Sequence, residues 1–330
     1  MLVNVGDVIM MTSALELIRQ KRPRTRIAVL ARPDAAELLN GNPCLDELII
    51  YPYRSGSPFH GLGELLGRIR QGHYEAFLSL DRRPRGAMAA ALAGIKERIG
   101  PDILFAGARP KFWTKFLFTR QIHMTEDECR GSLVEMFQLV VRRGLEIEGK
   151  GRITLPPVSP EKQQWVGQLF QGAKGPVIGL CVRTNDPGKT WPMNRFVSLM
   201  RRLHQDYNAF MYITGGPADR EYVAQLTEKL GPVPALDLAG QTRLMDIPAL
   251  AAQSDLCITL DNGTAHLMAN SGLEKLICIM IATAPKILID SMPQAEFISF
   301  SSENGHWPDN EIETDAERVF QAAAKMIEKK

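Results

Sequence analysis

The fold is decided by the stretch Ser254-Asp255-Leu256-Cys257-Ile258-Thr259-Leu260-Asp261-Asn262-Gly263-Thr264-Ala265-His266-Leu267. Its first half is an apolar run of strand length, and its second half is a turn of small polar residues. Apolar residues at helical spacing follow the turn. The pattern therefore predicts a strand, a polar turn and a helix. In an open parallel sheet, ligands bind at such turns because the carboxyl end of a strand meets the amino end of a helix there.

The residues of this turn suit a phosphate group. Gly263 allows backbone amides to approach a ligand closely, while Asn262 and Thr264 offer neutral hydrogen-bonding groups. The start of a helix adds partial positive charge. The alternative is that Asp261, Asn262 or Thr264 only caps the helix. Similar turns elsewhere in the chain favour the ligand site.

The composition is that of a globular protein with a proper core. The chain has 330 residues, enough for two domains, and 45% of them are hydrophobic. The net charge is +2, but residues 1–155 contain 23 Lys and Arg against 17 Asp and Glu, which gives +6. A basic first half favours an anionic partner there, although a solvated surface has the same balance. Nucleic-acid binding is not expected, because it needs more positive charge and a recognisable module.

The cysteines and the chain start indicate a cytoplasmic protein. The five cysteines form no Cys-x-x-Cys pair, so we expect reduced core residues. Residues 1–7 contain no basic residue before the apolar ones, so no signal peptide is expected. The longest apolar run, residues 276–282, is far shorter than the roughly 20 residues of a membrane helix. Any membrane contact is therefore expected to be peripheral.

The first half of the chain alternates strands and helices, which predicts βαβ units and a parallel sheet. We expect strands at residues 2–5, 26–30, 47–51 and 75–80. We expect helices at residues 8–20, 33–40, 61–70, 85–93 and 126–143. A proline-rich stretch, Pro156-Pro157-Val158-Ser159-Pro160, is typical of a linker. It predicts a domain boundary between residues 155 and 156.

The second half begins the same alternation again. We expect strands at residues 176–182, 209–214, 236–238 and 275–280, in addition to the opening stretch. We expect helices at residues 194–205, 218–230, 246–252 and 315–329, the last of them free to pack back on the first domain. The chain is therefore predicted to form two Rossmann-like α/β domains with open parallel sheets.

Residues 103–120 interrupt the alternation with cations and aromatic residues in turn. Such a segment can lie on a membrane surface or bind a lipid-linked anion. The alternative is an internal loop whose aromatic residues are core and whose cations point to water. Two polar residues at the end of the strand expected at 75–80 join this segment as candidate contacts of an acceptor or a membrane. The candidates are Asp81, Arg82, Arg109, Lys111, Trp113 and Lys115.

Asp7 follows the first expected strand and immediately precedes a helix. A carboxylate in this place can take a proton from a substrate, or it can simply be the N-cap of the helix. The loop of residues 183–192 follows another strand and contains the hydroxyl of Thr184 and the ammonium of Lys189. Such groups, in a loop held by two prolines, suit an anion.

The turn Thr214-Gly215-Gly216-Pro217-Ala218-Asp219 is rich in glycine. Gly215 and Gly216 allow close backbone approach, and Asp219 offers a carboxylate for sugar hydroxyls. Neither half of the chain has a Gly-x-Gly-x-x-Gly fingerprint after its first strand, which disfavours a nicotinamide dehydrogenase.

Taken in order, these turns resemble those of glycosyltransferase family 9, the ADP-heptose:lipopolysaccharide heptosyltransferases. The resemblance covers nearly the whole chain. Its motifs are Gly6-Asp7-Val8, Arg32-Pro33, Asn42-Pro43, Leu80-Asp81, Ile99-Gly100, Lys189-Thr190-Trp191-Pro192, Thr214-Gly215-Gly216-Pro217, Leu238-Ala239-Gly240 and Asp261 through His266. It implies a GT-B architecture, with residues 1–155 binding the acceptor, residues 156–330 binding the nucleotide sugar, and a cleft between them. It also implies inversion at the sugar carbon without a metal ion.

The resemblance implies a role for each matching residue. Asp7 matches the general base, and Lys189 matches the lysine at the nucleotide phosphates, with Thr184 in the same loop. Asp219 would lie near the ribose or base. The motif at the donor sugar and diphosphate comprises Asp261, Gly263 and His266. Two departures concern the donor: the family commonly has Thr in place of Asn262, and residues 281–285 replace its usual Phe-Gly-Pro-Thr.

The implied reaction moves heptose from ADP-heptose to the inner core of lipopolysaccharide. It needs no cofactor beyond the nucleotide sugar. The acceptor would be an anionic lipid-linked glycan, reached from the cytoplasmic face of the inner membrane. A family member using a hexose or N-acetylhexosamine donor is one alternative. Others are a nucleotide-sugar epimerase on a related fold and a two-lobed solute-binding protein, the latter disfavoured by the lack of an export signal.

Overall fold

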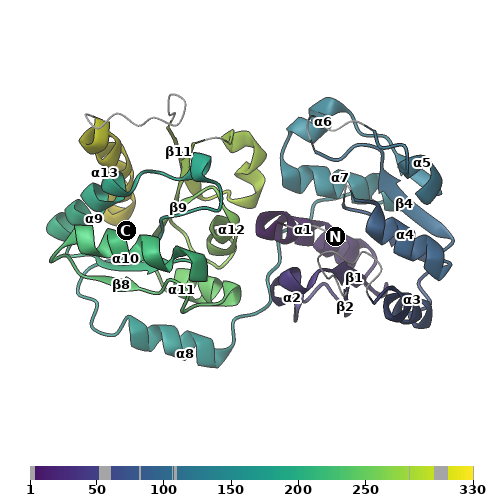
Figure 1. Ribbon diagram of the computed structural model, residues 1–330, viewed down its shortest axis with the longest axis horizontal. Coiled ribbons are helices and arrows are strands. Elements are labelled where there is room, and N and C mark those ends of the chain that lie inside the picture. Colours follow the sequence, from purple (N-terminus) through teal and green to yellow (C-terminus); the bar gives the residue numbers. More distant parts are fainter. Residues whose placement is uncertain are drawn as a thin grey trace. The chain divides into compact units, whose positions relative to one another are not determined.

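The computed structural model describes residues 4–51, 61–81, 83–105, 107, 110–281, 283–300 and 311–329 (Figure 1). The chain divides into two compact units, which are described separately below. The first unit comprises Met1–Pro157 together with Lys286–Ser291, and the second comprises Val158–Pro285 with Met292–Lys330. The division after Pro157 lies two residues beyond the boundary expected from the proline-rich stretch. No described helix has the length and apolar character needed to cross a bilayer.

The described part of the second unit contains a six-stranded sheet in which every strand pair is parallel. Its strand order is β11-β10-β9-β6-β7-β8. The strands are β6 (Val177–Cys181), β7 (Phe210–Thr214), β8 (Ala235–Asp237), β9 (Leu256–Leu260), β10 (Leu276–Met280) and β11 (Ala295–Ser299). All residues of β6, β9 and β10 are buried, as expected of parallel strands covered on both faces.

The strand order of this sheet reverses between β6 and β9. Ile178 of β6 lies opposite Leu256 of β9, although the two strands are far apart in sequence. From β6 the chain continues outward through β7 to β8, and from β9 it continues the other way through β10 to β11. Such a reversal leaves a crevice at the carboxyl ends of the two central strands, where α/β proteins bind ligands.

The helices of the second unit form two groups. In one group α9 (Met193–Tyr207) packs against α10 (Arg220–Leu230) and α13 (Ile312–Glu328). In the other, α11 (Ile247–Ala252) packs against α8 (Pro160–Leu169) and α12 (Gly263–Ala269). Right-handed crossovers in opposite directions from the switch point place the two groups on opposite faces of the sheet.

The first turn of α9 is anchored to α13 by a buried ion pair. The guanidinium of Arg195 is fully buried, and its Nε donates to Asp315 Oδ2 at 2.6 Å. Trp191, just before the helix, stacks on Phe300 with ring centroids 5.6 Å apart. The ion pair holds the start of α9 against α13, and the stacking holds the loop before α9 against the residue that follows β11.

The described part of the first unit contains two small parallel sheets. One pairs β1 (Ala28–Ala31) with β2 (Glu47–Ile50), and the other has the order β3-β4-β5, with β3 (Ala76–Leu78), β4 (Glu97–Pro101) and β5 (Arg120–Ile122). The helices are α1 (Val5–Lys21), α2 (Pro33–Leu39), α3 (Leu62–Gln71), α4 (Pro84–Ala93), α5 (Thr114–Leu117), α6 (Glu126–Arg130) and α7 (Leu133–Leu145). The parallel α/β class predicted for both halves is therefore confirmed.

Helix α1 is the central helix of the first unit and packs against α7 and α2. The segment around Gly151 approaches α1 so closely that a Cβ added to Gly151 would clash with the carbonyl oxygen of Ser13. Asn42 Nδ2 donates to the carbonyl of Thr154 at 2.8 Å, and the Thr154 N–H donates to Thr12 Oγ1 at 3.0 Å. The short turn η5 (Ile289–Ser291) of the returning segment packs on α7.

The predicted start of the first helix was wrong. A strand was expected at residues 2–5 and a turn at Gly6-Asp7, but α1 already begins at Val5, and residues 2 and 3 lie outside the described residues. Asn4 has an extended backbone, and its carbonyl accepts the N–H of Val8 at 3.2 Å, which closes the first helical turn. Asp7 therefore lies within the first turn of the helix rather than before it.

The single helix predicted for residues 126–143 is two helices. The chain leaves α6 at Gly131, whose backbone is extended, and Ser132 then caps α7 by accepting the Glu135 N–H at 3.4 Å. The expected interruption at residues 103–120 contains α5 and leads into β5. The elements β4, α8 and β11 had not been predicted either. The remaining expected elements are present, with ends shifted by up to two residues, except that α13 begins three residues earlier than expected.

Candidate functional site

The loops at the carboxyl ends of β6, β9 and β10 converge on one carboxylate. Lys189, in the loop after β6, places its Nζ 2.7 Å from Asp261 Oδ2 at the end of β9. Thr283, after β10, donates its hydroxyl to the same oxygen. Because β10, β9 and β6 are consecutive in the sheet, these groups meet at the switch point of the strand order.

The loop that contains Lys189 is held by its own hydrogen bonds. Thr184 Oγ1 donates to the Asp186 carbonyl at 2.6 Å, and Asp186 Oδ1 accepts the Gly188 N–H at 2.9 Å. The turn η1 (Pro187–Lys189) follows, and the buried indole of Trp191 fixes its exit. The hydroxyl of Thr184 is therefore used within the loop, while the Lys189 ammonium extends to Asp261.

Asn262 connects β9 to β6 and also caps α12. Its Oδ1 accepts the Ala265 N–H at 3.1 Å, so Asn262 is the N-cap of this helix. Its Nδ2 donates to the carbonyl of Arg183 at 3.2 Å and lies 3.2 Å from Cys181 Sγ. Gly263 and Thr264, the first residues of α12, are half-buried beside it. Asn262 therefore holds together the two strand ends that flank the switch point.

The glycine-rich turn after β7 is closed by Asp219. Its Oδ2 accepts the Gly216 N–H at 2.8 Å, and its Oδ1 lies 3.3 Å from Arg183 Nη1. A Cβ added to Gly215 would lie 2.9 Å from the Asp219 Cβ, so glycine is needed there for the turn itself. The Arg183 guanidinium also lies over the ring of Tyr222, 5.6 Å from its centroid. Asp219 thus organises the turn from within.

His266 is buried close to the carboxylate of Asp261. Its side chain on α12 is only 3% exposed, and its Nδ1 has no hydrogen-bond partner among the described residues. Burial lowers the pKa of His266 to about 4, although the nearby Asp261 charge opposes the shift. The imidazole is therefore neutral at pH 7, and any ligand contact it makes is a hydrogen bond rather than a charge interaction.

The predicted residues of the first unit lie at strand and helix ends. Asp7, in the first turn of α1, accepts a hydrogen bond from Asn4 Nδ2 at 3.1 Å. Asp81 is buried after β3, and its Oδ1 accepts the Arg83 N–H at 3.3 Å. Arg82 and Arg109 lie outside the described residues.

Some aromatic residues of the segment around α5 are buried and others are exposed, and the exposed ones are not those expected. Trp113 is half-buried and packs edge-on against Phe118 with centroids 5.6 Å apart. Phe112 and Phe116 are instead 79% and 77% exposed. Lys111 and Lys115 are exposed beside them. The aromatic face that meets solvent is therefore formed by two residues that the sequence reading had not singled out.

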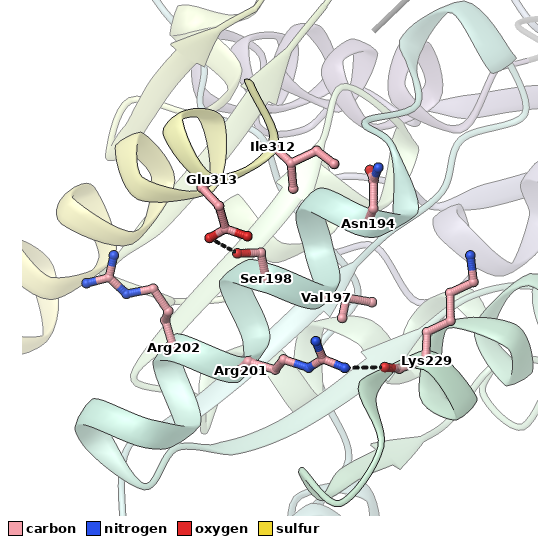
Figure 2. Close-up of a pocket in the computed structure, with 8 residues that line it drawn as sticks. All are labelled: Asn194, Val197, Ser198, Arg201, Arg202, Lys229, Ile312 and Glu313. Carbon is pink, nitrogen blue, oxygen red and sulfur yellow. Dashed lines mark hydrogen bonds between the residues drawn. The ribbon is translucent and has the colours of Figure 1, made fainter. Parts of the chain in front are cut away.

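A surface hollow of roughly 470 Å³ lies elsewhere, between α9, α10 and α13 (Figure 2). Arg201 donates to the carbonyl of Lys229 at its rim, and Ser198 donates to Glu313 (Figure 2). None of the predicted site residues lines it. The chemistry of the switch point, rather than the size of a hollow, therefore identifies the candidate site.

The site combines cations, carboxylates and hydroxyl groups. Two residues had been missed: Arg183, which pairs with Asp219, and Thr283, which bonds to Asp261. Their position in the sequence could have indicated them, because both residues follow the end of a strand within three residues. Lys189 offers a cation to an anionic group, and the carboxylates can accept hydroxyl groups. Within the described ranges, no cluster of three or more His, Cys, Asp or Glu side chains is placed to hold a metal ion.

Comparison with known proteins finds a matching family and similar sequences. A family model described as glycosyltransferase family 9 (heptosyltransferase) matches residues 63–318. The chain is 24% identical over 279 residues to lipopolysaccharide heptosyltransferase 2 of Escherichia coli K12, a match covering 80% of this chain and 77% of the relative.

Two solved structures share the fold. The glycosyl transferase family 9 structure from Veillonella parvula superposes with a TM-score of 0.81 at 18% identity, covering 99% of this chain and 95% of the other. The Escherichia coli ADP-heptose lps heptosyltransferase II superposes with a TM-score of 0.79 at 20% identity, covering 99% and 96%. The latter is a GT-B heptosyltransferase, so the predicted GT-B fold class is confirmed.

The buried His266 gives a pH prediction. Its pKa is about 4 in the folded chain, below the roughly 6.5 of an unfolded chain, so acid protonates the unfolded state first. The stability that the neutral, buried imidazole allows is fully present above about pH 6.5 and is lost as the pH falls toward 4. Between pH 7 and pH 5, we expect this group to lower the free energy of unfolding by about 2 kcal/mol.

Urea unfolding at the two pH values, at constant ionic strength, measures the effect. His266→Gln should show a pH-dependent loss smaller by that amount, whatever its stability at pH 7. An equal loss in both proteins would contradict the assignment.

Proposed function

The chain belongs to glycosyltransferase family 9, and from that membership we propose that it transfers heptose from ADP-heptose to the inner core of lipopolysaccharide. The curated relative is itself a lipopolysaccharide heptosyltransferase, and one solved relative is described as using ADP-heptose. We propose that the transfer inverts the anomeric carbon and needs no metal ion, as the family resemblance implies. A hexose or N-acetylhexosamine donor is the alternative within the same family.

The observation that carries the proposal is the Lys189–Asp261 pair at the switch point. Lys189 Nζ lies 2.7 Å from Asp261 Oδ2, at the carboxyl edge where parallel sheets bind nucleotides. In the reaction, the negative charge that develops on the departing diphosphate needs a nearby cation. Lys189 supplies one, and the N–H groups at the start of α12 lie on the same edge. The second unit is therefore proposed to bind the nucleotide sugar.

The proposed chemistry is a direct displacement. The acceptor hydroxyl oxygen forms a bond to the anomeric carbon while the bond from that carbon to the diphosphate oxygen breaks. The bonding electrons leave with the nucleoside diphosphate, and the hydroxyl proton passes to Asp7 as general base. Asp7 is half-exposed in the first turn of α1, so its carboxylate is accessible to a hydroxyl group. The first unit is therefore proposed to bind the acceptor.

We further propose that the protein works as a peripheral protein on the cytoplasmic face of the inner membrane. Phe112 and Phe116 are exposed next to Lys111 and Lys115. Exposed aromatic side chains flanked by lysines fit the interface of an anionic bilayer, because the rings enter the acyl boundary and the ammonium groups meet the headgroups. A lipid-linked acceptor would be reached from such a position.

Donor binding tests the proposal directly. Nucleotide sugars linked to ADP, GDP or UDP are screened for an increase in melting temperature, and ADP-heptose is expected to give the largest shift. Lys189→Ala should lose most of that shift, because it removes the cation at the phosphates. The matched control is Lys229→Ala, an exposed lysine at the end of α10. A full shift in Lys189→Ala would remove the lysine from the donor site, and a larger shift with another sugar would establish the alternative donor.

Asp7 is tested by turnover. Asp7→Ala should lower kcat by about 10² to 10⁴ while the affinity for the nucleotide remains, since a general base acts on the chemical step. The control Asp127→Ala removes an exposed carboxylate from the first turn of a different helix in the same unit. Near-normal turnover of Asp7→Ala would assign the base to another group.

Membrane contact is tested by flotation with vesicles containing phosphatidylglycerol. The double variant Phe112→Ala, Phe116→Ala should bind at least about 10-fold more weakly, because two large apolar side chains no longer enter the interface. Ile289→Ala, which truncates an exposed apolar residue of the same unit, is the control. If the double variant floats like the wild type, a different surface contacts the bilayer.

A further inference from the structure

Asp261 accepts two hydrogen bonds on a single oxygen. Lys189 Nζ and the Thr283 hydroxyl both donate to Oδ2, and they come from the loops on either side of β9. Oδ1 accepts no hydrogen bond from any described residue. The Asp261 side chain is only 10% exposed, so these two donors provide most of what stabilises its charge.

Lys189 and Thr283 are expected to respond differently when a nucleoside diphosphate binds. On the proposed function, the ammonium of Lys189 is needed at the diphosphate, and turning toward it weakens the ion pair with Asp261. In the part of the chain that the structure describes, Lys189 is the only cation in an ion pair with Asp261, and a mostly buried carboxylate that loses such a partner is strongly destabilised. Thr283 is neutral and has no such second task, so its hydroxyl can stay on Oδ2 throughout. Hydrogen bonds to a charged acceptor are about twice as strong as neutral ones.

We propose that Thr283 is a positioning residue that stabilises Asp261 when Lys189 leaves it for the phosphates of the donor. The inference rests on the proposed function and adds a residue that matches none of the recognised motifs. It makes the threonine a determinant of diphosphate affinity, although it acts through Asp261. It also leaves Oδ1 of a fixed carboxylate available to a hydroxyl group of the donor sugar.

Thr283→Val tests this inference, because it replaces the hydroxyl with a methyl group of similar size. ADP, GDP and UDP are each titrated into the wild type by calorimetry, and the tightest of them is used for all variants. Thr283→Val should bind that nucleotide about 10- to 100-fold more weakly, the value of a hydrogen bond to a charged group. Thr283→Ser should remain within about threefold of the wild type, because it keeps the donor.

The matched control is Thr227→Val, which removes a hydroxyl that donates to a helix carbonyl within α10. It should bind the nucleotide like the wild type. If Thr283→Val does not fold, Thr283→Ala replaces it in the same comparison. The donor KM should rise with the dissociation constant in Thr283→Val, with a smaller change in kcat.

A double-mutant cycle with Asp261→Asn separates positioning from direct contact. Asparagine carries no charge, so the departure of Lys189 leaves nothing to stabilise, and adding Thr283→Val should change nucleotide affinity by less than about twofold. An equal loss in both backgrounds would show that Thr283 acts without Asp261 and would overturn the inference. So would wild-type affinity in Thr283→Val. If no nucleoside diphosphate binds the wild type, the proposed function fails as well.

Discussion

The reversal of strand order between β6 and β9 is the constraint on which the candidate site depends. At this point the two crossover directions diverge, so no helix connection covers the carboxyl ends of the two central strands. The polar residues of the site occupy this edge, and Asn262 joins its two sides through Arg183 and Cys181. The buried Arg195–Asp315 pair fixes the start of α9, and thereby the end of the loop that contains Lys189. The strand order of the sheet therefore determines where the residues of the candidate site lie.

The fold was predictable wherever local pattern and tertiary environment agree. Leu256–Leu260 is buried throughout and apolar except for Thr259, because both faces are covered, and its composition and length indicate a strand without further information. One error overlooked a local helix break, and another falls where non-local pairing decides. Residues 126–143 are helical in pattern, yet Gly131 and the cap at Ser132 divide them. The short strand β11 is only half-buried along most of its length, so its pairing with β10 stabilises it more than its own sequence does.

The site was predictable in its position more than in its contacts. Motif order identified the turns of Lys189 and Asp261, because strand ends are visible in a sequence. Which polar group bonds to which is decided by strands distant in the chain. The sequence predicts Asp219 as a ligand contact, and the structure adds that it closes its own turn and pairs with Arg183. Thr283 could not be linked to Asp261 without knowing that β10 lies next to β9. The hydrogen-bond partners of the site residues can therefore be predicted only once the strand order of the sheet is known.

The assignment of Lys286–Ser291 to the first unit has a consequence for how the protein is made. The chain leaves this unit after Pro157, builds most of the second unit, and returns for six residues before it goes back. During synthesis on the ribosome, the site on α7 that receives η5 stays uncovered until nearly nine-tenths of the chain has emerged. Severing the linker after Pro157 would also leave two further connections intact. The amino-terminal unit is thus among the first parts to be translated and among the last to be completed.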